Sequence, residues 1–223
     1  MDECVDGSWK LNPQTGFVDV DGDFWCSEQG LTDFKGVKFG KVSGDFFCND
    51  NELTSLVGAP QTVGWGFYCY GNQLTSLVGA PQSVDGYFRC EDNKLTTLEG
   101  APKTVKKDFN CYDNQLTSLV GAPQTVGGDF DCHGNALTTL VGAPQSVKRD
   151  FYCNGNPVSE TTLDAIFALM RKGKPYQQAL EERWPKMGDE DRVLMYKEMS
   201  NLSPEDIRKY KALATYNNIK DYL

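Results

Sequence analysis

The sequence predicts an α/β protein: a solenoid of about seven short repeats, with short parallel strands on its concave face, followed by a small all-α C-terminal domain. Three observations support this prediction. Seven cysteines recur at steps of 21 or 22 residues between Cys26 and Cys153. Each block contains an alternating Phe-x-Cys pattern, and the composition changes after Pro157. Self-similarity with a fixed period of about 20 to 50 residues is typical of solenoids and related repeat architectures.

Residues 1–21 precede the first repeat and predict an N-terminal hairpin cap. Two segments with apolar residues, Trp9–Leu11 and Phe17–Val20, flank the turn-forming sequence Asn-Pro-Gln-Thr-Gly at residues 12–16. A Pro/Gly-containing turn between two such segments is a hairpin signal. Because a solenoid needs a cap over its open end, we assign that role to this hairpin.

Residues 22–158 contain the repeats, of which Gly66–Leu77 is an example: Gly-Phe-Tyr-Cys-Tyr-Gly-Asn-Gln-Leu-Thr-Ser-Leu, followed by Gly-Ala-Pro and a Val. Phe-x-Cys alternates with period two, which predicts a short strand with Phe and Cys pointing inward. The Leu, Ala and Val residues complete the buried ring. The Asn three residues after Cys is expected to bond the backbone where the chain leaves the strand, forming a ladder. Gly permits the corner, and Pro fixes φ on the return side, where no ladder N–H is needed.

The pattern Phe-x-Cys-x-x-Asn-x-Leu-Thr-Ser-Leu resembles the short leucine-rich repeat, L-x-L-x-x-N-x-L-x-x-L. The Leu-Thr-Ser-Leu and Ala-Pro elements resemble the 20- to 21-residue repeats of bacterial leucine-rich proteins. The Gly-Ala-Pro and Cys elements, with Asn156–Ser159 and a helical tail, resemble leucine-rich repeat proteins encoded by tailed bacteriophages. The family has no single assigned activity, so the resemblance implies a fold rather than a reaction.

Residues 159–223 predict four helices that form a small all-α domain and cap the last repeat. Ser159 is a helix N-cap candidate, and Ser203-Pro204 starts another helix with Pro at its first position. Two further helices are expected from Tyr176 and from Asp189. These 65 residues hold 11 basic and 11 acidic side chains, so the net charge of −9 belongs to residues 1–158.

The net charge argues against direct binding to nucleic acid or to an anionic membrane surface, since both require basic side chains. The N-terminus, Met-Asp-Glu-Cys-Val-Asp-Gly, lacks the basic and apolar regions of a signal peptide. The sequence has no apolar run of about 18 residues that would span a membrane. We therefore expect a cytoplasmic protein, located in the host cytoplasm if a phage encodes it.

Three columns of side chains flank the inward Phe and Cys and should point outward onto the concave face. These columns vary in composition although the rest of the repeat is nearly constant, which indicates a surface that packing does not dictate. Exposed aromatic side chains carry much of the energy of protein interfaces. The predicted partner-binding residues are Trp25, Phe47, Tyr68, Tyr70, Tyr87, Arg89, Glu91, Asp108, Tyr112, Asp129, Asp131, His133, Asp150 and Tyr152.

The carboxylates of Asp108, Asp129 and Asp150 should stack on adjacent strands. Like charges at this spacing repel by up to about 1 kcal/mol even in water. A basic partner would relieve the repulsion. The alternative is that these carboxylates are solvated and simply tolerated.

The residues that could carry chemistry have simpler interpretations. The cysteine ladder predicts core packing rather than a redox or metal site, because a metal needs ligands that converge on one point. His133, the only histidine, stands near Asp131 and is interpreted as a contact residue. No phosphate-binding loop or H-E-x-x-H motif occurs. Residues after Cys153 contain no Cys or His, so they cannot run the chemistry of the bacterial leucine-rich ubiquitin ligases. We predict no enzymatic activity, no cofactor and no metal.

The predicted function is a non-enzymatic protein–protein interaction module, a phage factor that binds and inhibits a host defence or regulatory protein with a basic patch. One alternative is an acidic nucleic-acid mimic that blocks a DNA- or RNA-binding protein. Another is a virion or other structural component that self-associates. The sequence leaves the partner and the oligomeric state open.

Overall fold

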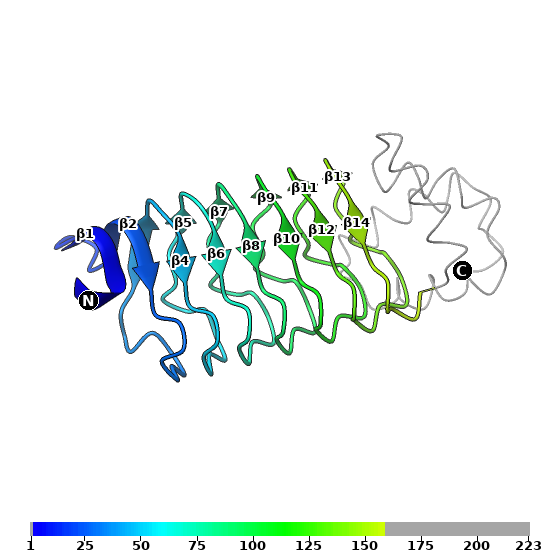
Figure 1. Cartoon of the computed structure of the whole chain (residues 1–223), viewed down its shortest axis with the longest axis horizontal. Coiled ribbons are helices and arrows are strands. Elements are labelled where there is room, and N and C mark those ends of the chain that lie inside the picture. The colour runs from blue at the N-terminus through cyan, green and yellow to red at the C-terminus, as the bar shows by residue number, and fades with distance from the viewer. Residues whose placement is uncertain (1, 159–223) are drawn as a thin grey trace.

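The computed structural model describes residues 2–158, which form a parallel-strand solenoid of about six turns built from a repeating unit of about 21 residues (Figure 1). The turns lie side by side along the long axis of the molecule. The only helical element in residues 2–158 is the 3-10 helix η1 (Asp2–Cys4). The solenoid itself is therefore all β, and the predicted all-α domain at residues 159–223 lies outside the described residues.

Each turn contributes two short strands, which pair in parallel with the equivalent strands one turn away. We call the outward surface of the first series the strand face and that of the second series the return face. The first series is β4 (Phe46–Phe47), β6 (Phe67–Tyr68), β8 (Phe88–Arg89), β10 (Phe109–Asn110), β12 (Phe130–Asp131) and β14 (Phe151–Tyr152). The second series is β3 (Phe39–Val42), β5 (Thr62–Val63), β7 (Ser83–Val84), β9 (Thr104–Val105), β11 (Thr125–Val126) and β13 (Ser146–Val147).

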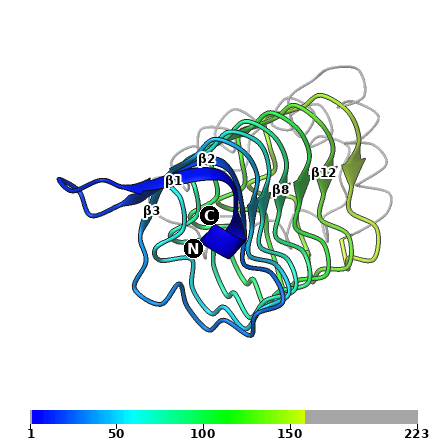
Figure 2. The ribbon, with the colours of Figure 1, turned by 60° about the vertical axis from the view of Figure 1, so that its left-hand side comes forward.

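The two series meet at the N-terminal end, on strand β2 (Val18–Trp25). Its first half pairs with β3 and its second half with β4. Strand β1 (Val5–Leu11) pairs antiparallel with β2 over its whole length. Figure 2 shows the resulting hairpin projecting beyond the first turn. The hairpin and the solenoid thus share one strand, which also carries Phe24, the first of the seven predicted repeat starts.

The interior is a column of stacked phenylalanine rings. The five from Phe46 to Phe130 are fully buried, and the ring centroids of successive turns from Phe46 to Phe151 lie 5.0 to 5.6 Å apart. Buried Cys, Leu and Val side chains of each turn surround the rings. Each ring covers the next, which explains why a single turn could not bury its apolar surface alone.

The predicted asparagine ladder is present and ties neighbouring turns together. Asn93 Oδ1 accepts the backbone N–H of Leu74 at 2.9 Å. Its Nδ2 donates to the carbonyl oxygens of Cys69 (3.0 Å) and Cys90 (3.2 Å). One buried amide therefore satisfies backbone groups of two turns, which water cannot reach. The same arrangement recurs at Asn51, Asn72, Asn114, Asn135 and Asn156.

The corner glycines also behave as predicted. Gly100 has a φ of 94°, and a Cβ there would collide with the carbonyl group of Leu77 in the previous turn. The return side differs from the prediction because it carries its own ladder. In three turns that ladder begins one residue after the Pro, as where Gln82 N–H donates to Gln61 O at 3.0 Å. From β5 onward the return strands carry only Thr-Val or Ser-Val pairs, without an alternating pattern such as Phe-x-Cys, so this second series of strands was not predicted.

Candidate functional site: the strand face

The structure places the predicted partner-binding residues on the strand face, in stacks one turn apart. Parallel, in-register pairing aligns Tyr68 with Arg89, and Arg89 with Asn110. Three groups of side chains result. An aromatic row is formed by Trp25, Phe47 and Tyr68. A central cluster is formed by Tyr70, Arg89, Glu91 and Tyr112. The C-terminal turns carry Asp108, Asp129, Asp131, His133, Asp150 and Tyr152. Tyr87, which directly precedes β8 and is exposed, belongs to none of the three groups.

The aromatic row consists of three parallel rings. The centroids of Trp25 and Phe47 are 5.7 Å apart with an interplanar angle of 7°, and those of Phe47 and Tyr68 are 4.5 Å apart at 10°. Burial, with a contribution from the Asp45 carboxylate, raises the pKa of Tyr68 to about 12. Gly66 stands next to this ring, because a Cβ at that position would overlap the Tyr68 side chain. The row is thus a packed, ordered part of the surface.

The central cluster surrounds a buried carboxylate. Glu91 is only 1% exposed, and its Oε1 pairs with Nε (2.6 Å) and Nη2 of Arg89. The Tyr112 hydroxyl donates to the same oxygen at 3.4 Å, and the Arg89 guanidinium carbon lies 5.1 Å from the centroid of the Tyr70 ring. The other oxygen, Glu91 Oε2, is buried without a hydrogen-bond partner. Burial raises the pKa of Glu91, while the charge of Arg89 acts in the opposite direction.

His133 is held between two neighbours. Its ring stacks on Tyr112 with centroids 4.5 Å apart and an interplanar angle of 11°. Its Nδ1 lies 2.7 Å from Asp131 Oδ1. The ring is therefore fixed in position on the surface, an arrangement suited to a contact residue.

The aspartates before each Phe have a structural role that the sequence interpretation missed. Asp108 Oδ1 accepts the backbone N–H of Asp129 at 2.9 Å, and Asp129 Oδ1 accepts that of Asp150 at 2.9 Å. Asp45 Oδ1 likewise accepts the N–H of Gly66 at 2.6 Å. A signal was available, since Asp recurs directly before the strand and its short side chain readily bonds nearby backbone. These carboxylates are therefore neither only solvated nor only available to a partner.

The cysteine column is part of the interior. All seven repeat cysteines are buried and free of disulfides, whereas Cys4 is half-buried. Burial raises the pKa of Cys26 and Cys153 to about 12, and it also raises the pKa of the five cysteines between them well above the ordinary thiol value. A thiol that stays protonated is a poor nucleophile and a poor metal ligand. Within residues 2–158, no group of three or more His, Cys, Asp or Glu side chains is arranged to hold a metal ion.

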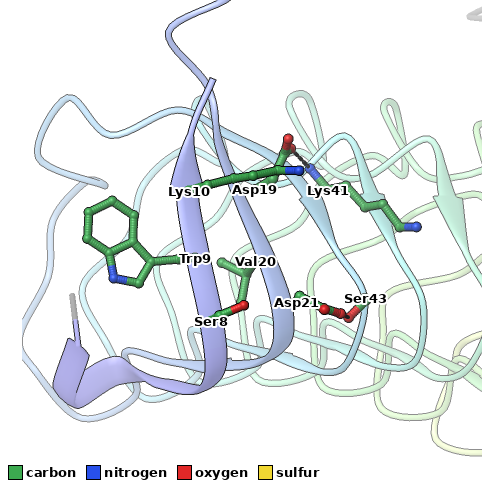
Figure 3. A pocket seen from close by; sticks show the side chains of 8 residues that line it. All are labelled: Ser8, Trp9, Lys10, Asp19, Val20, Asp21, Lys41 and Ser43. Carbon is green, nitrogen blue, oxygen red and sulfur yellow. Dashed lines mark hydrogen bonds between the residues drawn. The ribbon is translucent and has the colours of Figure 1, made fainter. Parts of the chain in front are cut away.

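A cavity of about 300 Å³ lies on the N-terminal hairpin, lined by residues of β1, β2 and the β3 segment (Figure 3). Its acidic side chains are already engaged: Asp19 Oδ1 accepts the Lys41 N–H at 2.9 Å, and Asp21 Oδ1 accepts the Ser43 hydroxyl at 2.9 Å. Ser43 Oγ in turn accepts the Gly22 N–H at 2.8 Å. These bonds connect the hairpin to the next turn, so the two aspartates that line the cavity have a structural role.

One exposed aromatic escaped the sequence interpretation. Trp65 is 59% exposed and lies two residues before Phe67, outside the three columns considered. Other turns have Gly44, Gly86, Lys107, Gly128 or Arg149 at the same position, so the aromatic side chain was a visible departure from the repeat. Trp65 therefore extends the set of exposed aromatic side chains beyond the predicted columns.

The described residues include no helix with the length and hydropathy that crossing a bilayer requires. No model of a known protein family matches the chain, and comparison with curated proteins also finds no match. Arguments about function therefore rest on the strand face itself.

Proposed function

We propose that this chain is a non-enzymatic protein-binding module whose strand face holds a partner with a basic patch. We further propose that its repeats are of the leucine-rich type and, from the resemblance to phage repeat proteins, that the partner is a host defence or regulatory protein met in the host cytoplasm. The observation that carries the proposal is that the outward columns of the strand face change from turn to turn, as does the corner just before them at Trp65 and Lys107, within an otherwise uniform stack. The interior and the return face repeat almost unchanged from turn to turn.

The charge of the strand face supports a basic partner. Its three outward columns carry seven carboxylates and one guanidinium, and the guanidinium is already paired with one of the carboxylates. Surfaces of one sign attract partners of the other and accelerate their encounter. The carboxylates are Asp23, Asp45, Glu91, Asp108, Asp129, Asp131 and Asp150.

The aromatic side chains would supply most of the binding energy. Trp25, Tyr87 and Tyr152 are each more than a third exposed, although they stand on an ordered sheet. Trp25, Tyr68 and Tyr112 are already fixed by stacking on neighbouring rings, and such side chains lose little conformational entropy when a partner docks. Tyr and Trp are also the residues most enriched among interface hot spots.

A capture experiment tests this proposal. The intact chain, a variant with Tyr68, Tyr70 and Tyr112 replaced by Ala, and a control with Thr62, Thr104 and Thr125 replaced by Ala would each be incubated with bacterial lysate and read by mass spectrometry. We expect a protein that the intact chain and the return-face control both retain and the tyrosine variant loses. Equal capture by the folded tyrosine variant would exclude the strand face. Displacement of the captured protein by duplex DNA, with strong salt dependence, would instead indicate nucleic-acid mimicry.

A second candidate is self-association through the N-terminal hairpin. Among the described residues, β1 pairs with β2 alone, so its other edge presents backbone groups that a further strand could pair with. Six of its seven residues are exposed, including Leu11 at 57%. An antiparallel pair of β1 strands would join two solenoids end to end.

Light scattering at rising concentration separates this candidate from a monomeric binder. A dimer that dissociates on replacing Ser8 and Leu11 with Lys, because charge on an edge strand opposes pairing, would support it. A mass equal to one chain at every concentration would rule it out. Replacement of Lys103 and Gln124, both exposed on the return side, with Glu serves as the control.

A further inference from the structure

Three successive turns place Tyr70, Glu91 and Tyr112 in one column of the strand face, each following a buried Cys. Strands one turn apart lie about 4.8 Å from each other, so the carboxylate stands between two aromatic side chains. Tyr112 is supported from behind by the stacked ring of His133. The column therefore forms a slot with aromatic walls and a carboxylate at its base.

The slot is filled by Arg89 of the same chain. Its guanidinium lies 5.1 Å from the Tyr70 ring centroid and contacts Glu91 Oε1 through both Nε and Nη2. The Arg89 side chain remains 37% exposed, so part of it faces solvent. A guanidinium thus fits between these walls, and the one present can move outward into solvent.

The pairing is incomplete at the other carboxylate oxygen. Arg89 is two residues from Glu91 in the same turn, and both of its contacting nitrogens converge on Oε1. Glu91 Oε2 stays buried without a partner, which is costly for a carboxylate. A guanidinium that enters from outside is not tethered, so it can align its two parallel N–H groups with both oxygens.

We propose that this slot binds the guanidinium of an arginine on the partner protein, and that Arg89 occupies it in the free protein and swings out on binding. The inference rests on the proposed function and names the partner side chain that the strand face recognises. A planar guanidinium can stack on Tyr70 while it pairs with Glu91. A lysine ammonium lacks that planar fork and would fit less well.

The inference is tested with a small probe rather than with the partner. Acetyl-Gly-Arg-Gly-amide and acetyl-Gly-Lys-Gly-amide would be titrated into the intact chain and into the Arg89→Ala variant in mildly alkaline buffer, with binding followed by NMR. Removing the internal competitor should strengthen binding of the arginine peptide about tenfold, equivalent to about 1.4 kcal/mol. The lysine peptide should bind more weakly to both proteins.

Two further variants separate the slot from general electrostatics. Adding Glu91→Gln to Arg89→Ala should abolish the gain. Arg149→Ala removes a guanidinium that lies 3.6 Å from Asp129 and should leave arginine-peptide binding unchanged. Guanidinium ion, far below denaturing concentrations, should raise the melting temperature of the Arg89→Ala variant more than the same ionic strength of sodium chloride does. Arg89→Gln provides a second variant if the alanine variant does not fold.

Equal arginine-peptide affinity in the intact chain and the Arg89→Ala variant would overturn the slot, as would binding that survives loss of Glu91. In that case a partner still lost by the tyrosine variant would leave the proposed function standing. If the intact chain captures no specific protein from the lysate, the proposed function is wrong, whatever the result of the peptide titrations.

Discussion

The strand face and the return face are built from the same turns and the same parallel pairing, yet they carry different side chains. The return face repeats one small or polar exposed residue per turn: Lys41, Thr62, Ser83, Thr104, Thr125 and Ser146. Along its length the strand face changes from an aromatic row, through the mixed central cluster, to the largely acidic C-terminal turns. A parallel ladder of two-residue strands can therefore form with a Thr or Ser at the exposed position of every strand. Backbone pairing therefore does not explain why the outward side chains of the strand face differ from turn to turn.

The comparison also separates two layers within the strand series itself. Phe109 points inward and is fully buried, whereas its neighbour Asn110 points outward and is half-buried. Because side chains alternate along a strand, one residue packs in the interior and stabilises the fold, and the next is available for contacts at the surface. The following substitutions test how completely the two roles are divided.

The largest effect is expected from Phe109→Ala. The ring is fully buried and stacks on Phe88 and Phe130, so its removal leaves a cavity that neighbouring turns cannot fill. We expect a loss of about 4 kcal/mol in the free energy of unfolding, measured by urea denaturation. Asn110→Ala, one residue away, should change it by less than about 0.5 kcal/mol. Comparable losses in the two variants would mean that the outward layer also holds the stack together.

Asn93→Ala comes next, with an expected loss of about 3 kcal/mol. It leaves the Leu74 N–H and the Cys69 and Cys90 carbonyls without their present partner inside the protein. Lys94→Ala, at the adjacent exposed position, is the matched control and should be nearly neutral. If Asn93→Ala were as mild as the control, water would have to reach the ladder.

The sequence predicted the interior well because the repeat shows the same residue type at each structural position seven times. Phe, Cys and Leu recur with a fixed period, and the position before the ladder Asn is always either Gly or Asp. At that position Gly71 and Gly134 have φ near 60°, and Asp50, Asp92 and Asp113 have φ near 50°. Both residue types tolerate this left-handed conformation, so the substitution pattern was itself a geometric signal.

The surface was less predictable because its interactions connect residues of different turns. The Arg89–Glu91 pair could be expected from their spacing, but burial of Glu91 depends on Tyr70 and Tyr112 in the neighbouring turns. The backbone bonds of Asp108 and Asp129 depend on the distance between turns, which no single repeat reveals. The return series of strands was not predicted because Thr-Val and Ser-Val pairs carry almost no periodic signal.

A smaller loss of stability is expected from a substitution on the strand face than from the two interior substitutions, and a return-face substitution in the same turn is its control. Asp108→Ala removes the acceptor for the Asp129 N–H and should cost about 1 kcal/mol. Thr104→Ala, on the return face of the same turn, should stay within about 0.5 kcal/mol of the unaltered protein. Thermal unfolding of both variants at equal ionic strength makes the comparison. A neutral or stabilising Asp108→Ala would show that repulsion along the column outweighs the backbone bond.

The smallest effect concerns the pH dependence contributed by Glu91. Because burial raises its pKa in the folded state, its contribution to stability is fully present below its ordinary pKa of about 4.5 and is lost as pH rises through the folded value. Glu91→Gln removes this titration, so the unaltered protein should gain stability relative to the variant on acidification from neutral pH. Urea midpoints of both proteins, with Glu99→Gln as an exposed control, measure the difference. Parallel pH profiles for all three would mean that Arg89 fully compensates the burial of the carboxylate, and the central cluster would then be an ordinary surface ion pair.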